Sequence, residues 1–298
     1  MLDPLKIRLA IAPIGWTNDD LPDLGAENTF AQCVSEMALA GFAGCELGSR
    51  FPQDISVLHQ ALSLRNLQVC NAWFSTFFTS RPPEETYAAF TRQVLKLKAL
   101  GAGIIGVSEQ GNSIQGRQDR PILEHKPVFS EAEWESVCRG FDNCGQIARD
   151  HGLFLTVHHH MGTGIQSGSE IDRLMQETDP ERVGLLYDTG HLAFSGENPL
   201  EVLRRHAGRI RHVHLKDIRG AVLARVLPEQ MSFLGAVRAG VFTVPGDGSI
   251  DFAPIFHELE SISYSGWLVV EAEQDPAKAD PLLYAMKARS YIREAAGL

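Results

Sequence analysis

The sequence of 298 residues predicts one (β/α)8 barrel, an α/β fold in which eight parallel strands alternate with helices. Three observations support this prediction. Short apolar runs alternate with amphipathic segments eight times, no linker or low-complexity tract separates them, and several of the apolar runs end on His, Asp or Glu. We expect residues 1–298 to form a single domain, because barrels often reach this length as one unit.

The first four strands are short apolar runs, and each is followed by a segment with apolar residues at three- and four-residue steps. The expected strands are Arg8–Pro13, Gly44–Leu47, Leu67–Trp73 and Gly103–Ser108, and the expected helices are Thr29–Ala40, Ile55–Arg65, Pro83–Leu100 and Glu131–His151. The last of these helices is the clearest, because Trp134, Val137, Phe141 and Cys144 fall on one stripe.

The second half of the chain repeats the pattern, with one long interruption. The expected strands are Leu153–Val157, Val183–Tyr187, Ile210–His214 and Trp267–Val270, and the expected helices are Ser169–Thr178, one from Pro199, one from near Phe252, and Pro281–Ala295. The connection over about 216–250 is too long for an ordinary loop, and its middle is apolar. It predicts a lid or substrate-binding element over the active face, or else an interface in a homo-oligomer.

A doubly wound sheet is the alternative fold. It would need a glycine-rich phosphate-binding turn after the first strand to be attractive, and the first turn, PIGWTND, has none.

Composition excludes several classes of protein. The formal net charge is −10 and the sequence pI is about 5.6, which disfavours nucleic acid, because phosphate binding needs clustered Lys and Arg. The five cysteines are scattered without a C-x-x-C pair, so disulfides and a cysteine metal site are not expected. No apolar run has the length of a membrane span or a signal peptide, and we therefore expect a cytoplasmic location.

Four predicted strands end on metal-binding residue types. The segment VGLLYDTGH ends on Asp188 and His191, and the pairs His158/His160, His212/His214 and Glu271/Glu273 are each spaced i, i+2. This spacing places both members of a pair on one face of a strand. A single strand-end Asp or His is more often a helix cap or a core residue. Four such ends in series favour a divalent transition metal, which binds imidazole and carboxylate together.

The motifs DTGH, HVHLKD, PGDGSIDF and GWLVVEAE resemble those of the xylose-isomerase-like TIM-barrel superfamily, which includes metal-dependent sugar isomerases, epimerases and the endonuclease IV group. Within it, IAPIGWTNDD, KPVFSEAEW, VHHHMGTGIQ and GLLYDTGH are similar to the inosose dehydratase family over essentially the whole chain. The resemblance implies dehydration of 2-keto-myo-inositol (scyllo-inosose), a polyhydroxylated ring ketone, to a trihydroxycyclohexane-1,2-dione in myo-inositol catabolism. It also implies a divalent metal, Mn or Co ahead of Zn, and it allows glutathione as a further cofactor.

Carried over by position, the resemblance implies metal ligands from the fifth to eighth strands. Three of these ligands are Asp188, His214 and Glu271, and the fourth that we expect is His158, at the end of the fifth strand. Related isomerases and epimerases usually place a glutamate where this chain has His158, and His160 on the same strand face is the alternative fourth ligand. Histidine in place of glutamate at position 158 favours a dehydratase over an isomerase or epimerase. A metal-binding barrel without catalysis is the remaining alternative.

Dehydration requires abstraction of an α-proton and departure of a β-hydroxyl, and so needs groups that accept and donate protons. The expected candidates for these roles are Lys216, His191, His160 and Glu273. We favour Lys216 and His191, which flank the ligands, although an ion pair of Lys216 with Asp217 or another acid and a hydrogen bond from His191 to a ligand carboxylate are alternatives. The expected substrate-binding residues are Trp16 and Asn18, with Asp19 and Asp20 beside them, and Glu46 and Glu109 at strand ends. Turn formation would explain Asn18 and its neighbours equally well.

Overall fold

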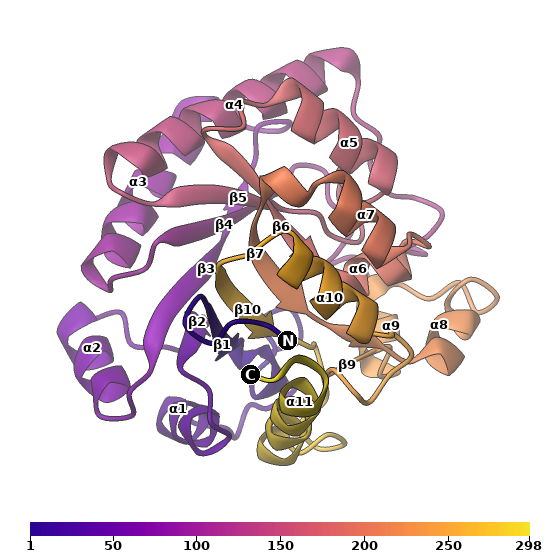
Figure 1. Cartoon of the computed structure of the whole chain (residues 1–298). Helices are drawn as coiled ribbons and strands as arrows, with labels where there is room; N and C mark the ends of the chain where they lie inside the picture. Colours follow the sequence, from indigo (N-terminus) through magenta and orange to yellow (C-terminus); the bar gives the residue numbers. More distant parts are fainter.

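Eight parallel strands close into a barrel in the computed structural model, which describes all 298 residues (Figure 1). Around the barrel the strands follow the order β1-β10-β7-β6-β5-β4-β3-β2. Their bounds are β1 Ile7–Ile11, β2 Gly44–Leu47, β3 Gln68–Thr76, β4 Ile104–Glu109, β5 Phe154–His158, β6 Val183–Asp188, β7 Ile210–Leu215 and β10 Gly266–Val270. The predicted fold is confirmed, and each predicted strand overlaps an observed one.

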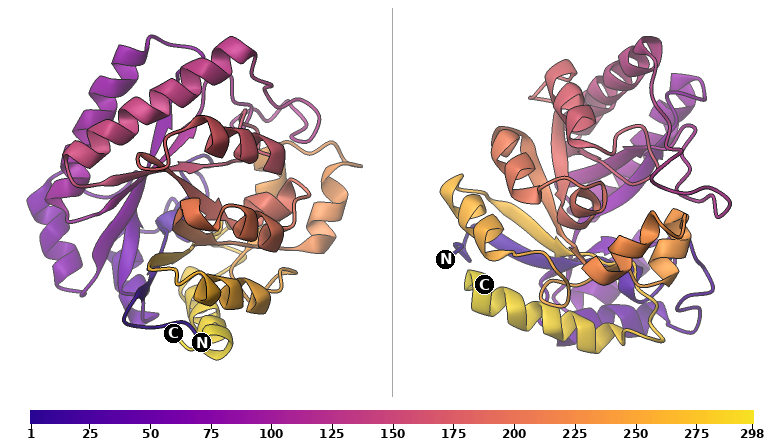
Figure 2. Two further views of the ribbon diagram at one scale, coloured as in Figure 1. Left: turned by 45° about the horizontal axis from the view of Figure 1, so that its top comes forward. Right: turned by 90° about the vertical axis from the view of Figure 1, so that its right-hand side faces the viewer.

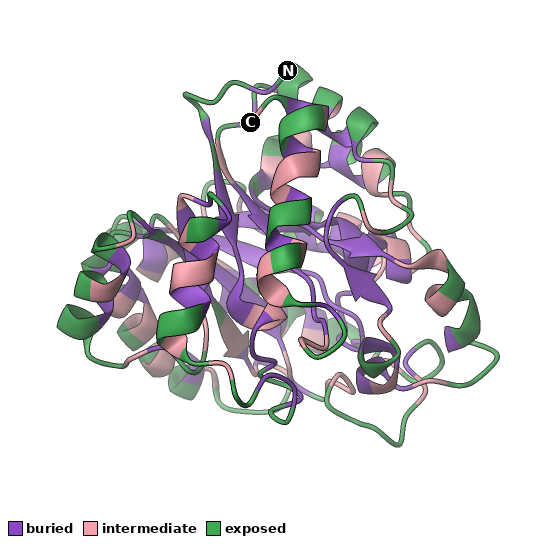
Figure 3. Cartoon of the chain, turned by 90° about the horizontal axis from the view of Figure 1, so that it is seen from below, coloured by how far each residue is buried: buried purple, intermediate pink, exposed green.

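Helices form the outer ring of the barrel. They are α1 Phe30–Leu39, α2 Ile55–Ser63, α3 Pro83–Ala99, α4 Glu131–Asp150, α5 Gly168–Glu177, α6 Thr189–Phe194, α7 Pro199–Arg205, α10 Ala253–Ser261 and α11 Pro281–Ala296. Figure 3 shows buried strands in the middle and helices whose outward faces are exposed. The strands are nearly continuous apolar runs because helices cover one side of each strand and the barrel core covers the other. In β6, every residue is buried.

Helix α6 was not predicted from the sequence. It follows β6 directly, and the Asp188 carboxylate caps it by accepting a hydrogen bond from the backbone N–H of His191 at 2.9 Å. A helix of six residues is too short to show an apolar stripe. The cap matters for function, because it fixes one oxygen of Asp188 and leaves the other free.

The two ends of the chain lie side by side (Figure 1). The backbone N–H of Leu2 donates to the carbonyl of Ala296 at 3.0 Å. All five cysteines are buried and unpaired. None of the helices combines the length and the apolar character that crossing a lipid bilayer requires.

The long connection after β7, predicted as a loop over about 216–250, has secondary structure of its own. It contains β8 Asp217–Ile218, α8 Gly220–Val226, α9 Phe233–Arg238 and β9 Phe242–Thr243, and its two strands pair antiparallel. Figure 2 shows this segment as a separate lobe beside the barrel. Its apolar middle is buried within the chain, where Phe233, Val237 and Phe242 pack with Phe194 and Met161.

Asp217 anchors this insertion to the end of β7. Its buried carboxylate accepts hydrogen bonds from four backbone N–H groups, those of Ile218, Gly246, Gly248 and Ile250. A Cβ at Gly248 would lie 2.3 Å from the carboxylate, which explains the glycine in the PGDG segment. Asp217 therefore makes no ion pair with Lys216 and instead sets the path of the insertion.

We expect Asp217→Asn to lower the free energy of unfolding by about 2–3 kcal/mol, because an amide cannot accept the four bonds that a buried carboxylate accepts. Urea titration of the purified protein measures the effect. Asp251→Asn is the matched control, since the Asp251 side chain is exposed and accepts only the N–H of Ala253. Equal losses in the two variants would contradict the anchoring role.

Candidate active site

The predicted site residues meet at a cavity of about 360 Å³ at the carboxyl ends of the barrel strands, which is the face where such barrels hold their chemistry. This volume is typical of small-molecule sites, which span roughly 300–1,000 Å³. Seven ionisable residues line the inner part of the cavity: Glu46, His158, His160, His191, His214, Glu271 and Glu273.

The ammonium of Lys216 lies at the centre of this group and is fully buried. Its Nζ is 2.5 Å from Glu271 Oε2, 2.7 Å from Glu273 Oε2, 3.5 Å from Asp188 Oδ2 and 3.0 Å from His191 Nε2. Burial alone would lower the pKa of Lys216, but Asp188, Glu271 and Glu273 outweigh it and raise the pKa above its ordinary value. Lys216 is therefore a stable cation that does not itself line the cavity.

Three of the four predicted metal ligands form one compact group. Asp188 Oδ2 lies 3.4 Å from His214 Nδ1 and 3.5 Å from His158 Nε2. Two ligands bound at about 2.1 Å to a tetrahedral ion are separated by about 3.4 Å, so one ion can reach all three atoms. Asp188 Oδ2 and His214 Nδ1 are buried and have no hydrogen-bond partner, which is the condition expected of atoms that serve a metal.

Neighbouring carbonyl groups fix the ring orientation of His158, the last residue of β5, and of His160, two residues later. His158 Nδ1 lies 2.6 Å from the carbonyl of His159, and His160 Nδ1 lies 2.9 Å from the carbonyl of Met161. A carbonyl oxygen only accepts, so each Nδ1 carries the proton. Burial lowers the pKa of both rings, and each neutral ring keeps an unprotonated Nε2. His158 Nε2 faces Asp188, whereas His160 Nε2 lies 3.9 Å from Glu273 Oε1.

Glu271, the fourth predicted ligand, pairs with Lys216 in this structure. It is not part of the group formed by His158, Asp188 and His214. Burial and repulsion from Glu273 raise its pKa to about 8, so the metal-free carboxyl holds a proton at neutral pH. When ionised, the carboxylates of Asp188, Glu271 and Glu273 carry three negative charges, and Lys216 supplies one positive charge. The remaining two negative charges match a divalent cation, and the donor set of carboxylate and imidazole suits Mn, Co or Zn.

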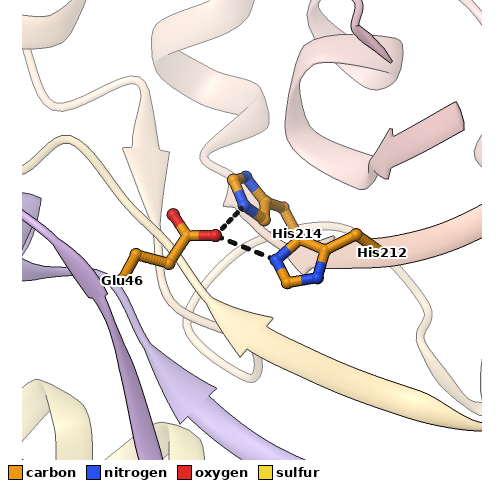
Figure 4. Close-up of side chains that lie close together, drawn as sticks. All are labelled: Glu46, His212 and His214. Carbon is orange, nitrogen blue, oxygen red and sulfur yellow. Dashed lines mark hydrogen bonds and ion pairs between the residues drawn. The ribbon is translucent and has the colours of Figure 1, made fainter. Parts of the chain in front are cut away.

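Two further clusters contain residues that can bind metal, but both are already occupied by protein contacts. His160, His191 and Glu273 form one cluster, and the Lys216 ammonium contacts two of its members. In the other, hydrogen bonds of 2.9 and 3.0 Å join the Nε2 atoms of His212 and His214 to Glu46 Oε1 (Figure 4). The His158, Asp188 and His214 group is therefore the one of the three whose atoms are best able to hold a metal ion.

The structure places several predicted substrate-binding residues away from the cavity. Trp16 is buried in the core, and its Nε1 donates to Glu36 at 2.6 Å. Asn18 forms a turn by accepting the N–H groups of Asp20 and Leu21. The Glu109 carboxylate accepts hydrogen bonds from a group of residues in the β3–α3 and β4–α4 loops and at the end of β3: Thr76, Phe78, Thr79 and Gly111. These three residues shape the loops around the site without lining the cavity.

Other residues line the outer cavity and were not predicted for this role. Trp73 in β3 is 40% exposed, and its ring meets those of His158 and His160 edge-on at 5.4 and 5.6 Å. The position of Trp73 at the end of a predicted strand was the signal that could have identified it. Gln115 donates to Asp20 at 2.7 Å, and its amide oxygen has no partner. Together these residues offer an aromatic face and polar groups to a ligand.

The insertion covers one side of the site. Phe233 of α9 packs against the rings of His160 and His191, and Phe242 of β9 packs against His191. Lys216 Nζ lies 4.6 Å from the centre of the Phe242 ring. These buried aromatic residues keep water from the back of the ionisable group, which strengthens each electrostatic interaction there.

Comparisons with known proteins agree with this architecture. Residues 34–295 match the model of a family described as "Xylose isomerase-like TIM barrel". The chain is 60% identical over 293 residues to an inosose dehydratase of Geobacillus thermodenitrificans, covering 98% of each chain. It is 58% identical over 297 residues to an inosose dehydratase of Clostridium beijerinckii, covering 100% of each.

Solved structures with low sequence identity share the fold. A probable 3-DHS dehydratase from Bacillus anthracis is 16% identical with a TM-score of 0.72, covering 95% of this chain and 98% of its own. The IOLI protein, solved with a bound zinc atom, is 15% identical with a TM-score of 0.73, covering 97% of this chain and 98% of its own.

We expect metal affinity to rise with pH. In the metal-free protein Glu271 holds a proton below about pH 8, and although burial alone would lower the pKa of His214, Glu46 and Asp188 raise it to about 10. A metal ion must displace both protons, so log K should increase by one to about two for each pH unit between 6 and 8. Competition with a chelating dye at several pH values measures this slope.

Glu271→Gln removes one of these titrating groups and one ligand charge. It should weaken binding and reduce the slope by about one, whereas the loss of affinity in Glu273→Gln should be milder. A larger loss of affinity in Glu273→Gln than in Glu271→Gln would exchange the roles that we assign to the two glutamates.

Proposed function

The chain belongs to the xylose isomerase-like TIM-barrel family, and we propose that it is a hydro-lyase that dehydrates 2-keto-myo-inositol. The whole-length identity to inosose dehydratases carries this proposal. The product is a trihydroxycyclohexane-1,2-dione, and the reaction belongs to myo-inositol catabolism. The geometry of the site agrees with a reaction that begins by loss of a proton next to a ketone.

The chemical demand is to stabilise an enolate. The α-proton of a simple ketone is too weakly acidic for a base that works at neutral pH, so the developing oxygen charge needs a positive partner. A divalent ion held by His158, Asp188, His214 and Glu271 would supply that Lewis acid. The side chains around it must bind the ring, accept the α-proton and return a proton to the leaving hydroxyl.

His160 is the best placed proton acceptor. It lines the cavity, and its protonated Nδ1 is held by the carbonyl of Met161, so its unprotonated Nε2 is available. Glu273 Oε1 lies 3.9 Å from this nitrogen and would stabilise the imidazolium once the proton has moved. His191 is less available as a base, because its Nε2 already accepts a hydrogen bond from Lys216.

Lys216 holds the two residues that face the departing hydroxyl. Its Nζ donates to both His191 and Glu273, which line the cavity while Lys216 does not. The proton that His160 takes from the α-carbon can reach the leaving oxygen through Glu273, while Lys216 stays a cation. This assignment gives proton transfer to His160 and Glu273, and it leaves Lys216 and His191, the residues favoured from the sequence, to position them.

The outer cavity suits a cyclic polyol. The ring carbons of such a substrate present C–H groups that pack against an aromatic face, which Trp73 supplies. Its hydroxyl groups need hydrogen-bond partners, which Asp19 and Asp20 supply.

An isomerase or epimerase of the same fold is the alternative function, and one residue argues against it. Return of the proton to the opposite face of the carbon needs a second acid there, and His158 stands where related epimerases usually have a glutamate. The Nε2 of His158 faces Asp188 and has no proton to give. A metal-binding barrel without catalysis would not need the proton-transfer groups that His160 and Glu273 provide.

The ligand set leads us to propose Mn or Co as the metal, with Zn as the alternative. Glutathione as a further cofactor, self-association and a cytoplasmic location stay predictions.

The decisive assay incubates metal-loaded protein with scyllo-inosose in deuterated water. We expect the dione to be the main product, with little deuterium and no epimer in the recovered substrate, because elimination outruns return of the proton. Mass spectrometry and proton NMR measure both quantities, and chelated protein is the control. Epimerised or isomerised inosose as the main product would establish the isomerase alternative instead.

His158→Glu tests the same assignment from the opposite direction. Restoring a carboxylate at this position should slow dehydration at least tenfold and raise deuterium exchange into recovered substrate. An unchanged dehydration rate would show that His158 is neither a ligand nor the residue that directs the reaction.

A further inference from the structure

We propose that Glu46, expected from the sequence to bind substrate, is a positioning residue that fixes the tautomer and ring orientation of His214 for metal binding. The inference rests on the metal site proposed above and extends it beyond the ligands themselves.

A single oxygen of Glu46 accepts three hydrogen bonds. Oε1 lies 3.0 Å from His214 Nε2 and 2.9 Å from His212 Nε2 (Figure 4). The same oxygen lies 2.7 Å from Asn71 Nδ2. Three convergent donors are more than one carboxylate oxygen usually receives, and all four residues are buried. The position of this oxygen is therefore closely determined.

Asn71 sets the direction of the network. Its Oδ1 accepts the backbone N–H of Gly106 at 2.6 Å, so its Nδ2 must point to Glu46. A Cβ at Gly106 would lie 3.0 Å from that amide, which leaves little room for another arrangement. A chain of hydrogen bonds thus runs from the backbone of β4 through Asn71 and Glu46 to His214.

The contact reaches across the barrel. Glu46 lies on β2 and His214 on β7, and β1 and β10 separate these two strands in the sheet. The pair is therefore not imposed by strand pairing, and it depends on the length of the glutamate side chain. An aspartate at this position would keep the charge but would be one methylene shorter.

The hydrogen bond determines which nitrogen of His214 can bind a metal. A carboxylate oxygen only accepts, so Nε2 carries a proton, and in the neutral ring Nδ1 is the atom with the lone pair. Nδ1 is the atom that lies 3.4 Å from Asp188 Oδ2 and has no hydrogen-bond partner. Carboxylates that hold a ligand histidine in this way typically contribute about 10- to 100-fold in metal affinity.

The test compares metal binding by the wild type, Glu46→Gln and Glu46→Asp, using Co²⁺ in competition with a chelating dye. We expect both variants to bind Co²⁺ about 10- to 100-fold more weakly than the wild type, with an altered visible absorption spectrum of the bound Co²⁺. Glu109→Gln is the matched control, because Glu109 is also a buried strand-end glutamate but contacts only hydroxyl and backbone groups. It should lose stability and keep the wild-type affinity.

Histidine-labelled, zinc-loaded wild-type protein gives a second measurement that needs no variant at Glu46. We expect a slowly exchanging Nε2–H for His214, assigned by its loss in His214→Gln, and a proton on Nδ1 instead would overturn the proposal. Unchanged Co²⁺ affinity in both Glu46 variants, or an equal loss in Glu109→Gln, would also overturn it. Failure of the wild type to bind Co²⁺ would refute the metal site itself.

Discussion

The buried ammonium of Lys216 allows three carboxylates to lie close together in the site. Three carboxylates cannot share so small a volume in their ionised forms unless positive charge lies among them, and Lys216 contacts Asp188, Glu271 and Glu273 at once. Its path requires Gly190 in the DTGH segment, because a Cβ there would come within 2.4 Å of the lysine side chain. Gly190 therefore leaves the space that the Lys216 side chain occupies.

Both the barrel strands and the insertion after β7 contribute residues to this site. Parallel strands bring their carboxyl ends together, so residues far apart in sequence supply ligands to one cavity. The insertion after β7 adds Phe233 and Phe242, which cover His160, His191 and Lys216 from behind. Low polarity behind the charged groups strengthens their interactions, and exclusion of water protects an enolate from unwanted protonation. By anchoring the insertion, Asp217 thus helps to hold Phe233 and Phe242 against the site.

Sequence patterns predicted the barrel and the strand ends because hydrophobic periodicity reports directly on burial, and His158, Asp188 and His214 lie where the apolar runs stop. The choice of these three residues as ligands came from the family resemblance. Side-chain direction was harder to predict. Glu109 and Asn18 lie in the expected segments, but local hydrogen bonds to backbone groups turn them into structural residues. Trp16 was expected at the cavity and lies in the core, whereas Trp73 lines the cavity. The partnership of Glu46 with His214 spans 168 positions, and no local pattern could indicate it.

We propose that one divalent ion and the Lys216 ammonium share the carboxylate cluster, with the ion on the His158, Asp188 and His214 side. Anomalous-scattering maps from crystals grown with Mn²⁺ or Co²⁺ can locate this ion. We expect one strong peak bounded by Asp188 Oδ2, His214 Nδ1 and His158 Nε2, with Glu271 beside it. A peak among His160, His191 and Glu273 instead, or no peak near these residues in metal-supplemented crystals, would show that the ion does not lie there.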